Sequence, residues 1–213
     1  MTYSLLLTDQ RRRWLAIASA TCTPAVGATV PAARATIGGV VSQAHTNSAL
    51  RQTALDLLAS GASAATAVTG ALAQDDHPEL RQLGVLDARG IAAHHTGTDV
   101  TPWSGAVARR GMLALGNLLT GPEVLAAMAA AADLESSREP LDRLALARRA
   151  LESLRAGQRA GGDRRGQQSA SILVVSLASE AQGARPVLDL RADDDPQPLD
   201  ILGELLEDVI QGA

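Results

Sequence analysis

Two helical patterns follow each other in the first half of the chain, with only Gly61 and Ala62 between them. Residues 49–58 begin after small polar residues that cap helices, and residues 64–73 begin after Ser63. Two helices joined this closely form an αα-hairpin, and the apolar side of such a hairpin must cover another element. The hairpin therefore predicts a sheet against which it packs.

Strand patterns surround this helix pair and a second one. Residues 87–90 carry turn formers between two apolar runs, which is the signature of a β-hairpin. Residues 22–33 hold two prolines and a glycine and are predicted as a loop or a broken strand. The predicted strands are 2–9, 14–21, 34–44, 81–87, 91–96, 111–119, 171–177 and 186–191, and the other helices are 124–134, 140–155 and 198–210. This order predicts an α+β fold in which two antiparallel sheets lie face to face with helices on both outer faces.

The composition excludes several classes of function. The chain has 213 residues, which we expect to form a single domain over residues 1–213. It contains no Phe, one Tyr and two Trp, so aromatic platforms for stacking nucleic-acid bases are nearly absent. A net charge of −4 and a pI near 5.5 also argue against a nucleic-acid partner. Every basic residue is Arg, so no Lys is available for catalysis.

The sequence shows no targeting or metal-binding pattern. No apolar run approaches the roughly 18 residues of a membrane-spanning helix, and the start lacks a signal sequence, so we predict a cytoplasmic protein without a membrane partner. Cys22 is the single cysteine, which excludes a disulfide framework. His94 and His95 are adjacent and point to opposite faces of a strand, so they cannot bind one metal ion together. We therefore expect no metal and no cofactor.

The first strand pattern begins at the second residue, Thr2. A small residue at this position generally permits removal of the initiator Met1, and the mature chain would then begin with Thr2. A hydroxyl and a free α-amine would lie on this one residue, and an α-amine with a reference pKa of about 7.7–8.0 can act as a base near neutral pH. The alternative is that Thr2 is an ordinary residue of a strand.

A glycine-rich polar segment, residues 156–170, lies directly before a predicted buried strand. Three glycines lie within three residues of Asp163, next to Arg164 and Arg165, and glycine allows the backbone to approach another group closely. The polar content is denser than a simple connection requires, which favours a functional loop. The alternative is the end of a helix followed by a surface turn.

The chain resembles the bacterial and archaeal family catalogued as domain of unknown function 1028. The resemblance is carried by residues 1–4, 42–44, 81–84, 96–97, 116–119, 160–170 and 189–193, and the run Gly-Gly-Asp-Arg-Arg-Gly-Gln-Gln-Ser at 161–169 is its most specific part. The order of elements is also similar to that of N-terminal-nucleophile (Ntn) hydrolases. This similarity implies a four-layer αββα sandwich of two antiparallel sheets, in which the first residue of the first strand is the nucleophile.

The residues and the resemblance together indicate an amidohydrolase that acts on a small amide or peptide-like C–N bond. Thr2 Oγ1 would attack the amide carbonyl while the Thr2 α-amine takes the proton. Asn117, at a strand end, would donate to the developing oxyanion, and Asp163 would orient Arg165 or the ammonium form of the nucleophile. The predicted substrate-binding residues are Arg165, which suits a substrate carboxylate, and Gln43, His45 and Ser169.

Two other functions remain open at this point. The first is a small-molecule-binding or assembly protein that keeps the fold without the chemistry. The second is a serine hydrolase that uses Ser4 or Ser169 with His45, although neither serine lies in a G-x-S-x-G motif. Many Ntn enzymes carry a Lys that lowers the pKa of the nucleophile, and here Arg34 or Arg165 would have to supply that positive charge. Ala-rich helices on a sandwich often pair across a two-fold axis, so we predict a homodimer.

Overall fold

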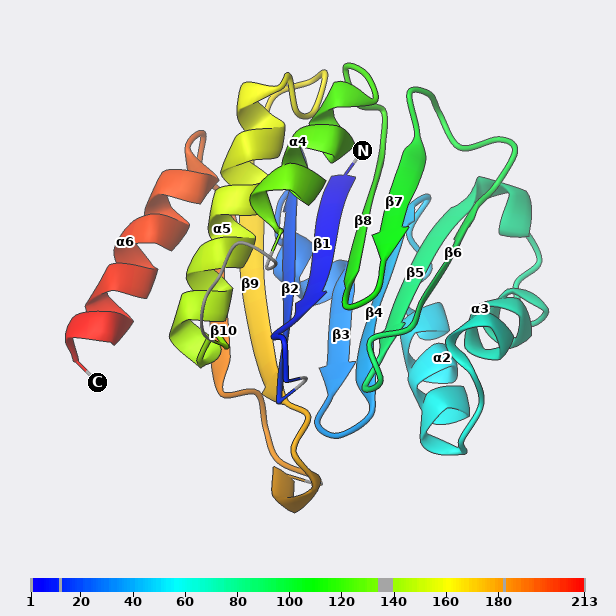
Figure 1. Cartoon of the computed structure of the whole chain (residues 1–213). Helices are drawn as coiled ribbons and strands as arrows, with labels where there is room; N and C mark the ends of the chain where they lie inside the picture. The colour runs from blue at the N-terminus through cyan, green and yellow to red at the C-terminus, as the bar shows by residue number, and fades with distance from the viewer. Residues whose placement is uncertain (1, 12, 134–139, 182, 213) are drawn as a thin grey trace.

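The computed structural model describes residues 2–11, 13–133, 140–181 and 183–212 (Figure 1). Within these residues, ten β-strands and six α-helices follow one another, and all neighbouring strands are antiparallel. The predicted α+β chain with two antiparallel sheets is therefore confirmed. None of the helices in this part of the chain is long and apolar enough to cross a membrane.

The six-stranded sheet contains the first strand, β1 (Thr2–Thr8), in its interior. β1 pairs with β2 along one edge and with β8 along the other. The strand order is β10-β9-β2-β1-β8-β7, and the other strands are β2 (Trp14–Thr21), β7 (Gly105–Arg109), β8 (Met112–Asn117), β9 (Ser169–Ser176) and β10 (Leu188–Ala192). The pattern at the second residue thus forms a central strand, whereas β7 adds a strand that the sequence does not predict.

The four-stranded sheet has the order β3-β4-β5-β6. The single strand predicted over 34–44 is wrong, because Thr36 has a φ of 67° and the Ile37 N–H donates to Arg34 O in a tight turn. The predicted loop or broken strand contains α1 (Val26–Thr29) and most of the first strand of this sheet. The four strands are β3 (Pro31–Arg34), β4 (Gly38–Ala44), β5 (Arg81–Asp87) and β6 (Ala92–Thr96).

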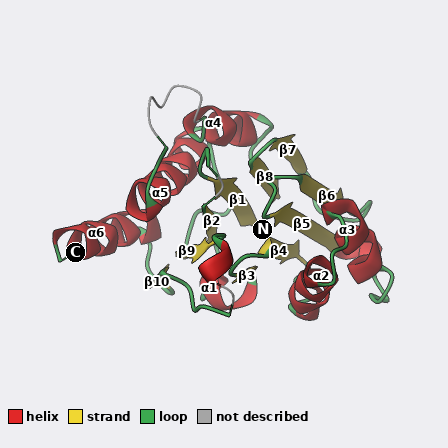
Figure 2. Cartoon of the chain, turned by 60° about the horizontal axis from the view of Figure 1, so that its bottom comes forward, coloured by secondary structure: helices red, strands yellow, loops and turns green. Residues whose placement is uncertain are grey.

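The helices other than α1 form two groups on two sides of the strands (Figure 1 and Figure 2). The predicted hairpin of α2 (Ala49–Ala59) and α3 (Ala64–Leu72) packs against the four-stranded sheet, where it contacts Val40 and Leu83. Leu134, the predicted end of the next helix, lies outside the described residues. The second group packs against the six-stranded sheet and consists of α4 (Glu123–Ala131), α5 (Arg143–Arg159) and α6 (Pro198–Gln211).

The layer between the two sheets is apolar at one end and polar at the other. Along β1, Tyr3 faces the helices, whereas Leu6 packs with Val41 of the other sheet. Side chains in a strand alternate between faces, so Thr2 and Ser4 share the inner face with Leu6. The buried polar side chains at this end are Thr2, Ser4, Ser19, Thr21, Gln43, Gln82, Asn117, Ser169 and Ser171. Burying polar groups costs free energy unless hydrogen bonds compensate, so this concentration of buried polar side chains marks the polar end as the candidate functional site.

Candidate functional site

Thr2 begins β1 and lies between the last residues of its two neighbouring strands. It is paired with Thr21 of β2 and with Asn117 of β8. The Cβ atoms of directly paired residues are about 4.5–5.5 Å apart in antiparallel sheets. Thr2 Oγ1 donates a hydrogen bond of 3.3 Å to Thr21 Oγ1, and Thr2 is 5% exposed. Two of the predicted catalytic residues, Thr2 and Asn117, are thus direct neighbours.

Asn117 is the last residue of β8 and is 1% exposed. Its Nδ2 donates to Gln82 Oε1 over 3.0 Å. The following residue, Leu118, has a φ of 55°, in the left-handed region that residues other than glycine rarely adopt. Such backbone outliers concentrate at functional sites. Here the turn at Leu118 ends the strand directly beside Thr2.

Gln43 and Gln82 bring two amides from the four-stranded sheet to this site. Gln43 Nε2 donates to Gln82 Oε1 (2.7 Å) and to the main-chain oxygen of Thr2 (3.4 Å), and Gln43 Oε1 accepts from Ser4 Oγ (2.8 Å). Both glutamines are fully buried, so Gln43, a predicted substrate-binding residue, contacts the protein interior. Gln82 is not among the site residues predicted from the sequence. The available signal is that each glutamine lies within a predicted strand, where a buried polar side chain needs a partner.

Asp163 approaches the same strand ends from the glycine-rich loop. Its Oδ2 accepts from the Cys22 N–H (3.1 Å) directly after β2, and its main chain bridges to Leu119 after β8. Gly161 has a φ of 117°, and a Cβ there would overlap Thr120 Oγ1, so glycine is required for this close approach. Asp163 is 8% exposed. The predicted close approach of the backbone is confirmed at Gly161. The alternative, a helix end followed by a surface turn, also describes part of the segment, because α5 ends at Arg159 and residues 164–166 are exposed, whereas Asp163 itself is buried.

Asp163 forms an ion pair with Arg165. Arg165 Nη2 lies 3.3 Å from Asp163 Oδ2, and the Arg165 N–H donates to Oδ1 over 2.7 Å. The Arg165 side chain is 41% exposed, so it reaches solvent at the rim of the site. Burial raises the pKa of Tyr3, the residue after Thr2, and the negative charge of Asp163 raises it further. The Asp163 carboxylate is therefore close enough for its charge to act on the phenol of Tyr3, whose side chain faces the helices.

Two other predicted substrate-binding residues, Ser169 and His45, have different surroundings. Ser169 is fully buried; its Oγ donates to Thr23 O (2.6 Å) and accepts from the Val26 N–H (3.0 Å), so it fixes the segment before α1. His45 lies in the loop after β4, and its main-chain N–H donates to a carbonyl before β5. Ser4 Oγ donates to a glutamine. The contacts of the described residues therefore do not join either serine to His45, as a serine hydrolase would require.

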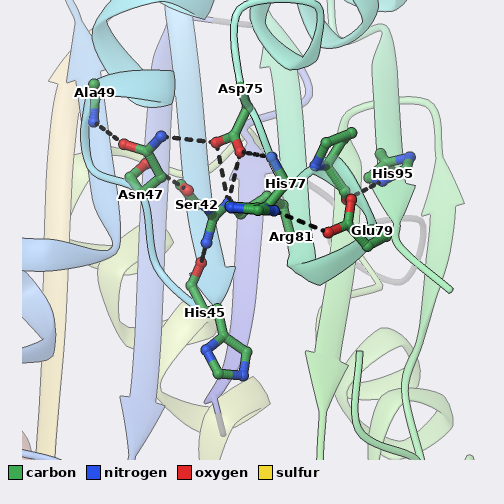
Figure 3. Close-up of polar contacts among 10 residues, drawn as sticks. Ser42, His45, Asn47, Ala49, Asp75, His77, Glu79, Arg81 and His95 are labelled. Carbon is green, nitrogen blue, oxygen red and sulfur yellow. Dashed lines mark hydrogen bonds and ion pairs between the residues drawn. The ribbon is translucent and has the colours of Figure 1, made fainter. Parts of the chain in front are cut away.

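A buried ion pair holds the loop that carries His45 (Figure 3). Arg81 Nε donates to both carboxylate oxygens of Asp75 (3.2 and 3.0 Å), and Asn47 Nδ2 donates to Oδ2 (2.7 Å). Arg81 Nη1 also donates to His45 O over 2.6 Å. Burial of the carboxylate acts to raise its pKa, but the hydrogen bonds from Arg81, from Asn47 and from the His77 N–H lower that pKa to about 2. The imidazole of His45 points away from this cluster in Figure 3.

Two hollows of the described surface lie away from the predicted site. A hollow of about 490 Å³ is found at the other end of β1, and its lining includes Thr8, Asp9 and Arg110. The Asp9 carboxylate accepts from three main-chain N–H groups of the turn between β1 and β2, so it serves that turn. A second hollow lies between α5 and α6. Among the described residues, no group of three or more His, Cys, Asp or Glu side chains could hold a metal ion.

The chain is similar to several solved structures. The crystal structure of protein SPO2555 from Silicibacter pomeroyi is 30% identical with a TM-score of 0.84, and the match covers 98% of this chain and 88% of that chain. Anbu (ancestral β-subunit) from Yersinia bercovieri is 12% identical with a TM-score of 0.42, covering 98% and 95%. An Anbu (Gly-1) mutant from Hyphomicrobium sp. strain MC1 is 14% identical with a TM-score of 0.44, covering 100% and 96%. TM-scores as low as those of the two Anbu structures do not establish a shared fold.

Family membership rests on a match along almost the whole chain. None of the curated proteins is similar enough to match it. The family model described as "Family of unknown function (DUF1028)" matches residues 2–202, a range that includes Thr2, Asn117 and Asp163. The Silicibacter pomeroyi structure is described with the same family. The expected family is confirmed: this chain belongs to DUF1028, a family of unknown function.

Proposed function

We propose that the chain is an amide hydrolase whose nucleophile is Thr2, exposed as the N-terminal residue by removal of Met1. The observation that carries this proposal is the register of β1, which pairs Thr2 with Asn117 at the polar end of an otherwise apolar layer. We further propose that the fold is the single-domain, four-layer αββα sandwich of Ntn hydrolases, since helices pack against each of the two sheets. Met1 itself lies outside the described residues.

The proposed reaction has two steps, and both use the Thr2 α-amine. In the first step, Thr2 Oγ1 attacks the amide carbonyl carbon, and its proton passes to the α-amine directly or through a water. The C–N bond then breaks, the leaving amine takes that proton, and the acyl group stays on Thr2 as an ester. In the second step, water attacks the ester carbonyl with the α-amine as base, and the acid leaves while Thr2 Oγ1 regains its proton.

We propose that residues at the same end of the sheet support the charge changes in this reaction. Asn117 Nδ2 carries a second hydrogen besides the one bonded to Gln82, and it is the proposed oxyanion donor. Loss of one such donor typically lowers a rate about 10²–10³-fold. Asp163 is proposed to favour the ammonium form of the α-amine. Arg165, at the rim, is proposed to bind an anionic group of the substrate.

The proposal predicts that the purified protein begins at Thr2 and that a β-lactone acylates this residue. Attack by the hydroxyl opens the lactone ring and releases nothing, so the intact mass rises by the whole mass of the lactone. Periodate cleaves a 1,2-amino alcohol and reports independently whether the amine and hydroxyl of Thr2 are both free. Thr2→Ser should still be acylated and Thr2→Ala should not, while both variants keep thermal stability close to that of the parent.

Two outcomes of this experiment would contradict the proposal. If Met1 is retained in protein isolated from its own host, Thr2 has no free α-amine and the mechanism fails. If Thr2→Ala is acylated at the parent's rate, the lactone reacts elsewhere and Thr2 is not the nucleophile.

The low exposure of the pair favours one other candidate, a small-molecule-binding protein that keeps the fold without the chemistry. Thr2 is 5% exposed and Asn117 is 1% exposed, so the two side chains meet little solvent. In this case a protein that begins at Thr2 should not react with the lactone, whereas amide ligands should still raise its unfolding temperature.

A further inference from the structure

The buried amides of Gln43, Gln82 and Asn117, here named the amide cluster, join the two sheets. The orientations of these amides are restricted, because two main-chain carbonyl oxygens fix which end of the Gln82 amide faces them. Gln82 Nε2 lies 2.9 Å from Gly116 O and 3.2 Å from Gly105 O. A carbonyl oxygen only accepts, so the Gln82 amide must turn its nitrogen toward these oxygens and its own oxygen the other way.

The orientation of the Gln82 amide determines which groups donate and which accept in the hydrogen bonds connected to it. Gln82 Oε1 accepts from Gln43 Nε2 (2.7 Å) and from Asn117 Nδ2 (3.0 Å), so both amides must present nitrogen to it. Gln43 Oε1 then faces Ser4 Oγ, which donates to it over 2.8 Å. Ser19 Oγ lies 2.8 Å from Ser4 Oγ and has to be the donor, since the Ser4 proton is already used. Each of these residues is at most 1% exposed, so bulk water does not compete.

This direction decides which atoms of the Asn117 amide are available to a substrate. The χ2 torsion of Asn is broad and roughly two-fold, so an unrestrained amide can turn over and exchange oxygen for nitrogen. The bond to Gln82 Oε1 selects one of the two orientations. The opposite orientation would direct Asn117 Oδ1 at Gln82 Oε1, and two acceptors repel each other. Without Gln82, the amide could offer an oxygen where an oxyanion needs a donor.

We propose that Gln82 is a positioning residue that fixes the Asn117 amide as a hydrogen-bond donor for the reaction at Thr2. This inference rests on the proposed function of Thr2 and Asn117. Gln43 supports the same arrangement, because its Nε2 also lies 3.4 Å from Thr2 O and so connects the main chain of the nucleophile to the amide cluster. A purely structural cluster would satisfy buried polar groups without affecting the reaction, and the experiments below separate the two roles.

The orientation is tested by NMR of the ¹⁵N-labelled parent and of Gln82→Met, which keeps the side-chain length and removes the amide. The side-chain NH₂ signals of Asn117 are identified by their loss in Asn117→Ala. In the parent we expect two separate signals that exchange slowly with solvent. In Gln82→Met we expect exchange about tenfold faster or more, because the protecting hydrogen bond is lost. Unchanged exchange in a folded Gln82→Met protein would overturn the proposal.

Gln82→Glu is the conservative variant, and it also decides the question if Gln82→Met does not fold. Burial raises the pKa of a carboxyl introduced at this position, so the neutral acid persists. Its O–H can donate to Gly116 O while its carbonyl oxygen still accepts from Asn117. The Asn117 signals should therefore stay protected in Gln82→Glu. Loss of protection in a folded Gln82→Glu protein would count against the proposed role.

The rate of acylation at saturating β-lactone tests whether the orientation matters for the reaction. We expect Gln82→Met to lower this rate about tenfold or more and to leave the half-saturating concentration within about twofold, since an oxyanion donor acts on the transition state. Adding Gln82→Met to Asn117→Ala should cause no further loss, because the two residues act as a unit. Losses that multiply in the double variant would show that Gln82 does not act through Asn117.

Ser171→Ala is the matched control for these rates. Ser171 lies at the same polar end, is 1% exposed, and its Oγ has no hydrogen-bond partner among the described residues. Its acylation rate should equal that of the parent. If the parent itself is not acylated, the proposed function fails, whereas the NMR signals of Asn117 still decide whether Gln82 fixes that amide.

Discussion

Ser4, Ser19 and Ser171 lie in one row across β1, β2 and β9. Ser4 donates to Gln43 and lies within hydrogen-bond distance of Ser19. Ser171 Oγ is equally buried but has no partner in the described part of the chain. Burying a hydroxyl removes its bonds to water, and only a protein partner compensates for that loss. Substitutions in this row therefore separate the effect of hydrogen bonding on stability from the effect of burial.

Ser171→Ala is expected to raise the free energy of unfolding by about 1 kcal/mol, because it removes an unsatisfied polar group. Ser4→Ala is expected to lower it by about 1–3 kcal/mol, because it leaves the buried Oε1 of Gln43 without its donor. Urea unfolding of the two proteins and the parent under the same conditions measures both changes. Equal destabilisation by the two substitutions would contradict the assigned hydrogen bonds.

At the scale of elements, the loop between α5 and β9 shows two glycines with similar backbones and different surroundings. Gly161 and Gly166 have φ values of 117° and 98°, so any other residue is strained at both positions. A Cβ at Gly161 would overlap Thr120 Oγ1, whereas a Cβ at Gly166 would meet nothing within 4 Å. Gly161 approaches Thr120 closely, and the same loop places Asp163 at the ends of β2 and β8.

Gly161→Ala and Gly166→Ala should therefore differ mainly by the steric contribution. We expect Gly161→Ala to be the more destabilising by about 1–3 kcal/mol, the usual cost of overpacking. Adding Thr120→Ala to the Gly161→Ala protein should recover part of this difference, because the overlapping oxygen is removed. Urea unfolding measures the series, and equal losses for the two glycine variants would show that Thr120 does not confine the loop.

The elements that the sequence predicts are those with a strong internal pattern. β1 is buried at every position and its sequence is mostly apolar, and one face of each helix of the α2–α3 hairpin is buried, so apolar residues recur there at helical spacing. β7 is an edge strand whose residues are half-buried or exposed, so it lacks that periodicity. β3 begins with Pro31, which predicts a break, although the first position of an edge strand tolerates proline. Pairing with a neighbouring strand, rather than their own sequence, thus sets β7 and β3, whereas the other two edge strands, β6 and β10, are predicted from the sequence.

The residues of the candidate site also differ in whether a local sequence pattern marks them. Thr2, Asn117 and Asp163 are predicted as candidates because the beginning of a strand pattern, a strand end and a glycine-rich loop mark them in the sequence. Gln82 has no such mark, since its partners Asn117 and Gly116 lie 35 and 34 residues away along the chain. These bonds exist only once the two sheets meet, so spacing along the chain cannot reveal them.

At the scale of the whole molecule, a buried carboxylate links separate parts of the fold. Asp75 follows the α2–α3 hairpin and bonds Arg81 at the start of β5 and Asn47 in the loop after β4 (Figure 3). The Asp75 side chain is 1% exposed. Arg34 and Asp56 also form an ion pair, but their side chains are 34% and 59% exposed. Exposed ion pairs contribute little to stability, whereas breaking a buried pair leaves an uncompensated charge.

Asp75→Asn should make the protein less stable near neutral pH and change its response to acid. The hydrogen bonds to Asp75 lower its pKa from the ordinary 3.8 to about 2. A carboxylate with a lower pKa in the folded state contributes stability above its unfolded pKa, and this contribution is lost as the pH falls from about 4 to about 2. The deficit of Asp75→Asn relative to the parent should therefore shrink over this window, as measured by urea unfolding at each pH.

Asp56→Asn is the matched control, because the pKa of Asp56 is also lowered, chiefly by the hydrogen bond from Arg34. Water screens this exposed pair, so Asp56→Asn should leave the free energy of unfolding near neutral pH close to that of the parent. Comparable destabilisation by the two substitutions would show that the buried Asp75–Arg81 pair contributes no more to the free energy of unfolding than the exposed Asp56–Arg34 pair. Because Arg81 also bonds His45 O, Asp75→Asn should further speed amide exchange in the loop after β4, which Asp56→Asn should leave unchanged.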